Sequence, residues 1–179
     1  MPRFYDISGM THNPEEFQLC IDIFVKRYQS LDIDYIAGLD ARGFVLGPPI
    51  ALALKKPFVM IRKVGKLPNA VTGQEYFKEY AGANAAGGDV LCMSRTAGKG
   101  KIGNRVLVID DLVATGGTLI AACDLLVSQG ATVVECACMV ELKCLDGYGK
   151  LKAKHPTVKV WGLISEDILT LEGKEGEGA

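Results

Sequence analysis

The sequence predicts an α/β fold in which helices cover both faces of a central parallel sheet. Apolar segments short enough to be buried strands alternate along the chain with segments whose apolar residues recur at helical spacing. Three of the strand candidates end in charged turns, at the strand ends where open α/β sheets bind ligands. The length of 179 residues predicts one domain, because it is sufficient to bury a sizeable core.

The order of strands and helices follows from local signals. The strand candidates are residues 35–39, 57–61, 105–109, 132–140 and 158–163, and helices are expected at residues 14–28, 44–54, 119–127 and about 144–154. Asn13 and Pro14 predict the start of the first helix, because Asn is a favoured N-cap and Pro is favoured at the first helical position. Pro48 and Pro49 restrict where the second helix can begin, and Gly130 is expected to end the third.

Residues from about 69 to 104 differ in composition from the rest of the chain. They are rich in glycine, alanine and polar residues, as in the segment AGANAAGG at residues 81–88. Loops of this length are uncommon in a compact domain unless they are functional lids or disordered segments. We therefore expect a long flexible excursion here, for which a hairpin is one arrangement that the chain could adopt.

The composition excludes several classes of protein. Twenty Lys and Arg residues against 21 Asp and Glu residues leave a net charge of −1, which offers no general attraction for nucleic acid or anionic lipid. The longest apolar runs, such as residues 106–109, are too short to span a membrane. The first residues lack the apolar segment of a secretory signal, so we expect a cytoplasmic protein without membrane or nucleic-acid partners.

The six cysteines are expected to be free and mostly buried thiols. They lie in apolar surroundings and form no CxxC pair of the zinc-binding type. Cys136 and Cys138 fall on one face of a predicted strand, but no further ligands are close to them in sequence. His12 and His155 lie outside any metal-binding motif. No residue is therefore assigned as a direct metal ligand.

The candidate functional residues follow three of the predicted strands, at residues 40–43, 62–66 and 110–118. In the last segment, Asp110 and Asp111 precede a turn of small residues that leads into a helix. Such a turn presents backbone N–H groups and the positive end of a helix to a phosphate. Carboxylates beside it can accept hydrogen bonds from ribose hydroxyls and help to hold Mg²⁺. An isolated acidic pair would more often be a simple turn, but the complete strand–turn–helix context favours a sugar-phosphate site.

Two other nucleotide motifs do not fit their context. Residues 98–103 satisfy the pattern GxGxxG but precede a strand, whereas the dinucleotide-binding fingerprint follows one. No Gly-Lys pair is followed by Ser or Thr, which excludes a P-loop within this sequence.

The segment VLVIDDLVATGGT at residues 106–118 closely resembles the signature with which type I phosphoribosyltransferases bind phosphoribosyl pyrophosphate (PRPP). Residues 34–44, 61–68 and 140–147, with the pair Glu79-Tyr80, are similar to members of this family that act on adenine. The resemblance implies a type I phosphoribosyltransferase fold, with a small hood from the N-terminal segment and a flexible lid loop. It also implies a homodimer.

The implied reaction transfers the phosphoribosyl group of PRPP to N9 of adenine and gives AMP and pyrophosphate. Mg²⁺ is the implied cofactor, bound through PRPP, and Asp110 or Asp111 could hold it through water. The alternatives are a phosphoribosyltransferase for a 6-oxopurine or orotate, a regulator that senses PRPP without catalysis, and an inactive scaffold subunit. A regulator would favour a DNA-binding module or a basic face, and the near-neutral sequence displays neither.

The resemblance assigns roles to individual residues. The ribose and 5′-phosphate are expected to bind to Asp110, Asp111, Ala114, Thr115, Gly116, Gly117 and Thr118. Pyrophosphate is expected to bind to Ala41, Arg42, Gly43, Arg62, Lys63 and Lys66. The adenine ring is expected to lie between the segment Arg3, Phe4, Tyr5 and the side chain of Leu142. Glu79, near the purine N7, and Arg62 are the implied catalytic residues; a solvated loop and a solvated strand end are the respective alternatives.

Overall fold

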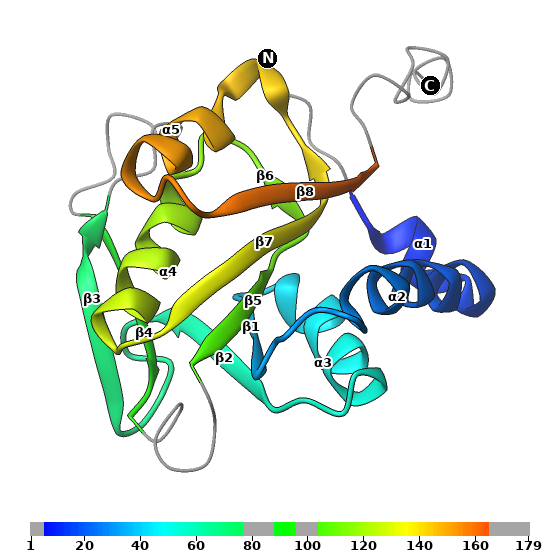
Figure 1. Ribbon diagram of the computed structural model, residues 1–179, viewed down its shortest axis with the longest axis horizontal. Helices are drawn as coiled ribbons and strands as arrows, with labels where there is room; N and C mark the ends of the chain where they lie inside the picture. Colours follow the sequence, from blue (N-terminus) through cyan, green and yellow to red (C-terminus); the bar gives the residue numbers. More distant parts are fainter. Residues whose placement is uncertain (1–5, 77–87, 96–103, 165–179) are drawn as a thin grey trace, which may run out of the picture.

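The computed structural model describes residues 6–76, 88–95 and 104–164, and these residues form a sheet with helices on both faces (Figure 1). The helices are α1 (Ser8–His12), α2 (Pro14–Tyr28), α3 (Gly43–Ala53), α4 (Gly117–Ser128) and α5 (Gly147–Lys154), with a 3₁₀ turn, η1, at Lys143–Leu145. The strands are β1 (Tyr35–Leu39), β2 (Phe58–Lys63), β3 (Ala70–Tyr76), β4 (Asp89–Ser94), β5 (Arg105–Ile109), β6 (Leu112–Val113), β7 (Thr132–Glu141) and β8 (Lys159–Ile164).

The centre of the sheet is parallel, as the sequence predicts. In the described residues the strand order is β3-β4-β2-β1-β5-β7-β6, and β8 also pairs with β7. Strand β1 pairs in parallel with β2 and β5, and β5 pairs in parallel with β7. The register places Leu39 beside Ile61, and Ile109 beside Ala137. The loops that follow β1, β2 and β5 therefore leave the sheet at the same edge.

Strands β3 and β4 extend this parallel centre with antiparallel pairs. They pair with each other, and β4 also pairs antiparallel with β2. Both lie within the segment predicted as a flexible excursion, so part of that segment is a hairpin that belongs to the main sheet. Its sequence contains only one clear apolar run, at residues 90–93, and β3 is mostly half-buried or exposed. Residues 77–87 and 96–103 of the predicted excursion lie outside the described residues, and its flexibility stays a prediction.

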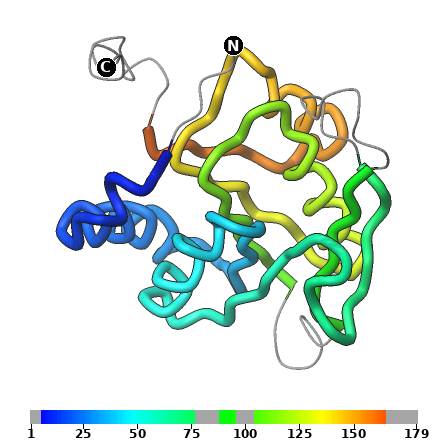
Figure 2. The backbone as a smooth tube through the Cα atoms, turned by 180° about the vertical axis from the view of Figure 1, so that it is seen from behind, coloured from blue at the N-terminus to red at the C-terminus, as the bar shows by residue number. Residues whose placement is uncertain are grey.

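The two faces of the sheet are covered by different helices. Side chains of α4 and α5, such as Leu126 and Leu151, pack into the buried cluster on one face. Side chains of α2 and α3, such as Phe24 and Ile50, belong to the cluster on the other face. The reverse view separates α2 and α3, in blue and cyan, from the yellow-green helix α4 (Figure 2). Helices on both faces confirm the layered architecture that the sequence predicts.

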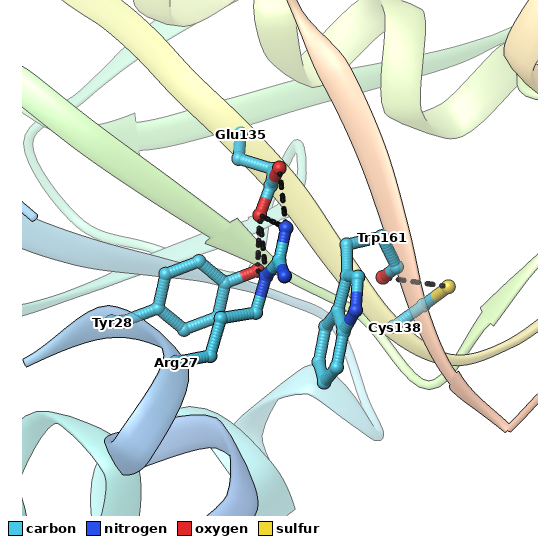
Figure 3. A network of polar contacts seen from close by, with 5 residues as sticks. All are labelled: Arg27, Tyr28, Glu135, Cys138 and Trp161. Atoms are coloured by element: carbon cyan, nitrogen blue, oxygen red, sulfur yellow. Dashed lines mark hydrogen bonds and ion pairs between the residues drawn. The ribbon is translucent and has the colours of Figure 1, made fainter.

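Helix α2 begins where the sequence predicts, and a polar network attaches it to the sheet. The Asn13 side chain accepts hydrogen bonds from the amides of Glu15 and Glu16, which caps the helix. At the other end of α2, Arg27 donates two hydrogen bonds of 3.0 Å to the carboxylate of Glu135 on β7. The Tyr28 hydroxyl donates to the same carboxylate at 2.6 Å (Figure 3). Helix α2 is thus held by polar contacts as well as by its apolar face.

Helix α3 begins at Gly43, and Pro48 and Pro49 lie inside it. The prolines therefore do not set its start.

All six cysteines are free, and five are buried, while Cys144 is exposed. Cys136 and Cys138 pack into the same apolar cluster, as their spacing predicts.

Residues 6–76, 88–95 and 104–164 contain no helix long and apolar enough to cross a bilayer. They also contain no group of three or more His, Cys, Asp or Glu side chains that could hold a metal ion.

Candidate active site

A cavity of about 160 Å³ lies at the edge of the sheet where the parallel strands end. The loops after β1 and β5 and the start of α4 line it, with residues Asp40, Ala41, Arg42, Asp110, Asp111, Leu112, Val113, Ala114, Thr115, Gly116, Gly117, Thr118 and Leu119. Two segments far apart in the sequence, 40–42 and 110–119, thus form one site. It brings together acidic side chains, a guanidinium group and a helix N-terminus.

Asp110 and Asp111 lie directly after β5. The Asp110 amide donates to the carbonyl of Ala137 on β7, and the Asp111 carbonyl accepts from the amides of Met139 and Val140, with all three bonds between 2.9 and 3.1 Å. Burial raises the pKa of Asp110 well above its ordinary value, and the neighbouring Asp111 carboxylate raises it further. The adjacent acids are therefore fixed by the sheet backbone in an environment that disfavours two full negative charges.

The loop at residues 40–43 lies against this acidic pair. Arg42 Nη1 is 2.8 Å from Asp111 Oδ2, and the Asp111 side chain is almost fully buried. Arg42 immediately precedes α3, and the peptide bond between Asp40 and Ala41 is cis. Gly43, the first residue of α3, is buried. The ion pair connects the loop after β1 to the loop after β5, and so couples the two sides of the cavity.

The basic residues predicted after β2 have different surroundings. Arg62 Nε is 2.9 Å from Asp40 Oδ2, so Arg62 reaches the cavity wall through this acidic residue. Its guanidinium also lies 5.7 Å from the ring centre of Phe44. Lys63 Nζ forms an ion pair of 2.8 Å with Asp89 on β4. Lys66 lies in the exposed turn after β2, and its carbonyl accepts a hydrogen bond from Arg62.

The turn at residues 114–118 leads into α4, and it lines the same cavity as the two acids. Gly116 has a φ of +84°, a left-handed conformation that L side chains rarely adopt, and it is the N-cap of α4. It has no side-chain cap, and the first N–H groups of a helix have no partner within that helix. Gly117, Thr118 and Leu119 line the cavity at this end. The geometry is that of an anion-binding helix N-terminus.

The residues predicted to contact adenine are mostly outside the described part of the chain. Arg3, Phe4, Tyr5 and Glu79 all lie there, and their roles stay predictions. Leu142 is described, and its side chain is only 2% exposed. Its amide donates to the carbonyl of Val113, so it supports the back of the cavity wall.

Two residues near the site have no role that was predicted from the sequence. Asp40 forms an ion pair with Arg62. Its position in the charged turn after β1, two residues before Arg42, could have indicated a role in the site. Gly147, at the start of α5, lies against the backbone of residues 114–116. No local pattern predicts that contact, because it joins two loops that are distant in sequence.

The sequence matches the family described as Phosphoribosyl transferase domain over residues 7–165. This match, together with the parallel sheet and the acidic pair before a helix N-terminus, defines the class of the protein as a phosphoribosyltransferase.

The relatives narrow this class. Adenine phosphoribosyltransferase 2 of Arabidopsis thaliana is 50% identical over 151 residues, which are 84% of this chain and 74% of the relative. The adenine phosphoribosyltransferase of Paraburkholderia phymatum is 43% identical over 81% of this chain and 73% of its own. The chain belongs to the adenine phosphoribosyltransferase family.

Solved structures confirm the predicted fold class. An adenine phosphoribosyl transferase from Trypanosoma brucei, in complex with AMP, pyrophosphate and ribose-5-phosphate, superimposes with a TM-score of 0.85 at 36% identity. This similarity covers 96% of this chain and 73% of the other. The Saccharomyces cerevisiae enzyme, crystallised with adenine and an imino-altritol bisphosphate, has a TM-score of 0.75 at 36% identity, covering 90% and 86% of the two chains.

Proposed function

We propose that this protein transfers the phosphoribosyl group of PRPP to N9 of adenine, with AMP and pyrophosphate as products. Membership of the adenine phosphoribosyltransferase family supports the reaction. The observation that carries the proposal is the cavity in which Asp110, Asp111 and the N-terminus of α4 face the loop of Arg42. Acidic groups suit ribose hydroxyls, a helix N-terminus suits a phosphate, and a guanidinium suits pyrophosphate.

In this reaction the bond between N9 and the anomeric carbon forms while the bond from that carbon to pyrophosphate breaks. The proton on the adenine ring nitrogen is lost, and the electron pair of the breaking bond leaves with pyrophosphate. Asp110 and Asp111 would bind the ribose hydroxyls, and residues 114–118 would hold the 5′-phosphate. With these groups fixed, the acceptor nitrogen and the leaving group can be held in line.

The ion pair between Arg42 and Asp111 has a consequence for substrate binding. Before PRPP binds, each group neutralises the other at 2.8 Å. PRPP offers hydroxyls to the carboxylate and phosphate oxygens to the guanidinium, so both groups can exchange partners without remaining unpaired in a low-dielectric site. Arg62, positioned by Asp40, would add positive charge near the departing pyrophosphate.

The remaining site residues keep the roles that the resemblance implies, and four of them (Arg3, Phe4, Tyr5 and Glu79) lie outside the described part of the chain. Glu79 would stabilise charge or move a proton near the purine N7. Arg3, Phe4 and Tyr5 would cover the adenine ring, with Leu142 on the opposite side. Ala41 and Gly43, with Lys63 and Lys66, would complete the pyrophosphate site.

Mg²⁺ is the proposed cofactor. Carboxylate oxygens are suitable ligands for Mg²⁺, and Asp110 and Asp111 supply them at the cavity wall. We propose that PRPP oxygens hold most of the ion's coordination sites, and that Asp110 or Asp111 contributes through water. When bound, the ion would neutralise pyrophosphate charge.

We also propose a homodimer. Large apolar side chains are exposed on α2 and α3, including Leu19 at 61% and Leu52 at 80%. Val45 lies seven residues before Leu52, and the two therefore share a face of α3. An exposed apolar face is a common feature of subunit interfaces. The cytoplasmic location stays a prediction.

The proposed reaction is tested by incubating the protein with PRPP and adenine, hypoxanthine, guanine or orotate, with and without Mg²⁺, and separating the nucleotides by chromatography. AMP formed from adenine, with little product from the other bases and none without Mg²⁺, is the expected result. If nucleotide formed from hypoxanthine, guanine or orotate instead, the enzyme would be a phosphoribosyltransferase for that base. PRPP binding without any product would favour the sensor or the scaffold subunit.

A variant tests the proposed role of Glu79 in the same assay. Glu79→Gln keeps the size of the side chain and removes its charge, and it should lower turnover by about 10²-fold or more, the usual contribution of a positioned acid–base group. Glu75→Gln, which changes a nearby exposed acid on β3, is the matched control and should retain turnover. Unchanged turnover in Glu79→Gln would remove Glu79 from the mechanism.

A further inference from the structure

Helix α5 contacts the proposed phosphate-binding turn through backbone atoms. A Cβ atom at Gly147 would overlap the carbonyl oxygen of Ala114 and lie 3.0 Å from the amide nitrogen of Gly116. A Cβ at Gly116 would in turn lie 2.7 Å from the carbonyl oxygen of Gly147. The two backbones therefore approach so closely that neither position has room for a side chain.

The far end of α5 is fixed to α4, the helix that follows the same turn. Asp124, on α4, accepts from Lys154 Nζ at 2.6 Å and is 3.0 Å from His155 Nε2. Between the two ends, Leu151 is fully buried in the cluster that also contains Leu119. Helix α5 is thus attached to the turn at its start and to α4 at its end.

The turn depends on such external support. Gly116 occupies a left-handed conformation, and no side-chain hydrogen bond caps the start of α4. The first residues of α4 line the cavity, and displacements there would change the directions of the N–H groups that face the ligand. Errors of about 1 Å in such groups can cost about a hundredfold in rate.

We propose that α5 braces the phosphate-binding turn, with Gly147 and Asp124 as positioning residues for the 5′-phosphate of PRPP. This inference rests on the proposed function, because it assigns the 5′-phosphate to residues 114–118. Gly147 acts through the backbone of Ala114 and Gly116 and does not touch the substrate. Asp124 fixes the opposite end of the brace.

The test is direct binding of two probes to the whole protein, measured by calorimetry. Ribose 5-phosphate reports on the turn, and pyrophosphate reports on the separate loop at residues 40–43. In Gly147→Ala, ribose 5-phosphate affinity should fall by about tenfold or more, while pyrophosphate affinity stays within about twofold of the wild-type value. Gly162→Ala is the matched control, because a Cβ there meets its nearest atom at 3.5 Å, an ordinary contact.

The enzyme assay should show the same difference as a change in the KM for PRPP but not in the KM for adenine. Gly147→Ala should raise the KM for PRPP and leave the KM for adenine near its wild-type value. Equal losses for both probes and both substrates would indicate general damage and overturn the proposal, as would unchanged ribose 5-phosphate affinity. If Gly147→Ala does not fold, Asp124→Asn is the variant that tests the brace. Weaker binding of ribose 5-phosphate with normal binding of pyrophosphate supports the brace. Wild-type binding of both probes overturns it.

The two proposals can fail separately. A wild-type protein that binds ribose 5-phosphate but forms no AMP would contradict the proposed function, and the binding comparison would still test the brace. A wild-type protein that forms AMP, with a Gly147→Ala variant that binds ribose 5-phosphate normally, would contradict the brace alone. A wild-type protein that binds neither probe would overturn both.

Discussion

Asp110 combines a functional placement with an unfavourable environment. Its amide is fixed to β7, and its Oδ1 accepts a hydrogen bond from the Asp111 amide at 2.9 Å. Burial and the Asp111 carboxylate raise its pKa, because the charged form loses hydration and lies beside a like charge. A group that we propose to bind ribose is thus a stability cost in the free protein, as is common for functional residues.

Asp110→Asn should separate these two effects. Because the folded-state pKa is raised, the folded protein binds a proton more tightly than the unfolded chain does. The stability of the wild-type protein therefore falls as the pH rises from about 3.9, the ordinary Asp value, through the folded-state pKa. Asparagine does not ionise, so it removes this loss of stability. Its side-chain oxygen can still accept the hydrogen bond from the Asp111 amide. At pH 7, without Mg²⁺ and PRPP, we expect the Tm of the variant to rise by roughly 2–4 °C, which corresponds to about 1 kcal/mol.

The same variant should bind PRPP more weakly, because a neutral amide is a poorer acceptor for ribose hydroxyls than a carboxylate. Thermal unfolding between pH 4 and pH 8 measures the stability effect, and calorimetric titration with PRPP and Mg²⁺ measures binding. The stability difference should disappear towards the acid end of this range. If Asp110→Asn were less stable than the wild type at pH 7, the Asp110 carboxylate would not destabilise the free protein, and this prediction would be wrong.

Among the contacts between elements, the polar network at the end of α2 joins this helix to the sheet through a buried charge. Glu135 is 6% exposed and receives hydrogen bonds from both Arg27 and Tyr28 (Figure 3). The Arg27 guanidinium also lies 4.6 Å from the ring centre of Trp161 on β8. Glu135 is near the amino-terminal end of β7, whereas the cavity is at the opposite, carboxyl-terminal edge of the sheet.

Glu135→Gln should therefore reduce stability without reducing catalysis. It removes the charge that pairs with Arg27 and weakens the hydrogen bond from Tyr28, so the free energy of unfolding should fall by about 2 kcal/mol. Tyr28→Phe, which removes a single hydroxyl, should cost about 1 kcal/mol. Urea unfolding of both variants and of the double variant measures the coupling. If fully folded Glu135→Gln lost catalytic efficiency, the network would belong to the functional site.

At the scale of the whole molecule, the exposed apolar side chains of α2 and α3 are the surface on which the proposed dimer depends. Among the described residues, Leu52 is the most exposed of the large apolar side chains, at 80%. Val127, on α4, is 49% exposed and lies on the helix layer that covers the other face of the sheet. The two positions therefore test two different surfaces of one molecule.

Leu52→Glu should convert the dimer to a monomer, because it introduces a charge into an apolar interface that would have to lose its hydration. Val127→Glu is the matched control and should leave the dimer intact. Size-exclusion chromatography with light scattering gives the mass of each species at several concentrations. A wild-type monomer would contradict the homodimer, and a dimeric Leu52→Glu variant would place the interface on another surface.

The elements whose signals are local could be predicted from the amino-acid sequence. Alternating apolar segments predicted the parallel strands, Asn13 and Pro14 predicted the start of α2, and residues 106–118 carried the sugar-phosphate motif in its strand–turn–helix context. These signals work because hydrophobic periodicity, capping and turn chemistry act between residues that are close in the chain. The family resemblance then connected the motif to a reaction.

The contacts between residues that are distant in sequence became visible in the folded structure. The parallel register brought the turns after β1, β2 and β5 to one edge, which placed Arg42 on Asp111 and Asp40 on Arg62. It also paired the β3–β4 hairpin with β2 and set Gly147 against the turn at Gly116. No local pattern encodes these contacts, because they depend on how whole elements pack and on the small distances that remain between their backbones.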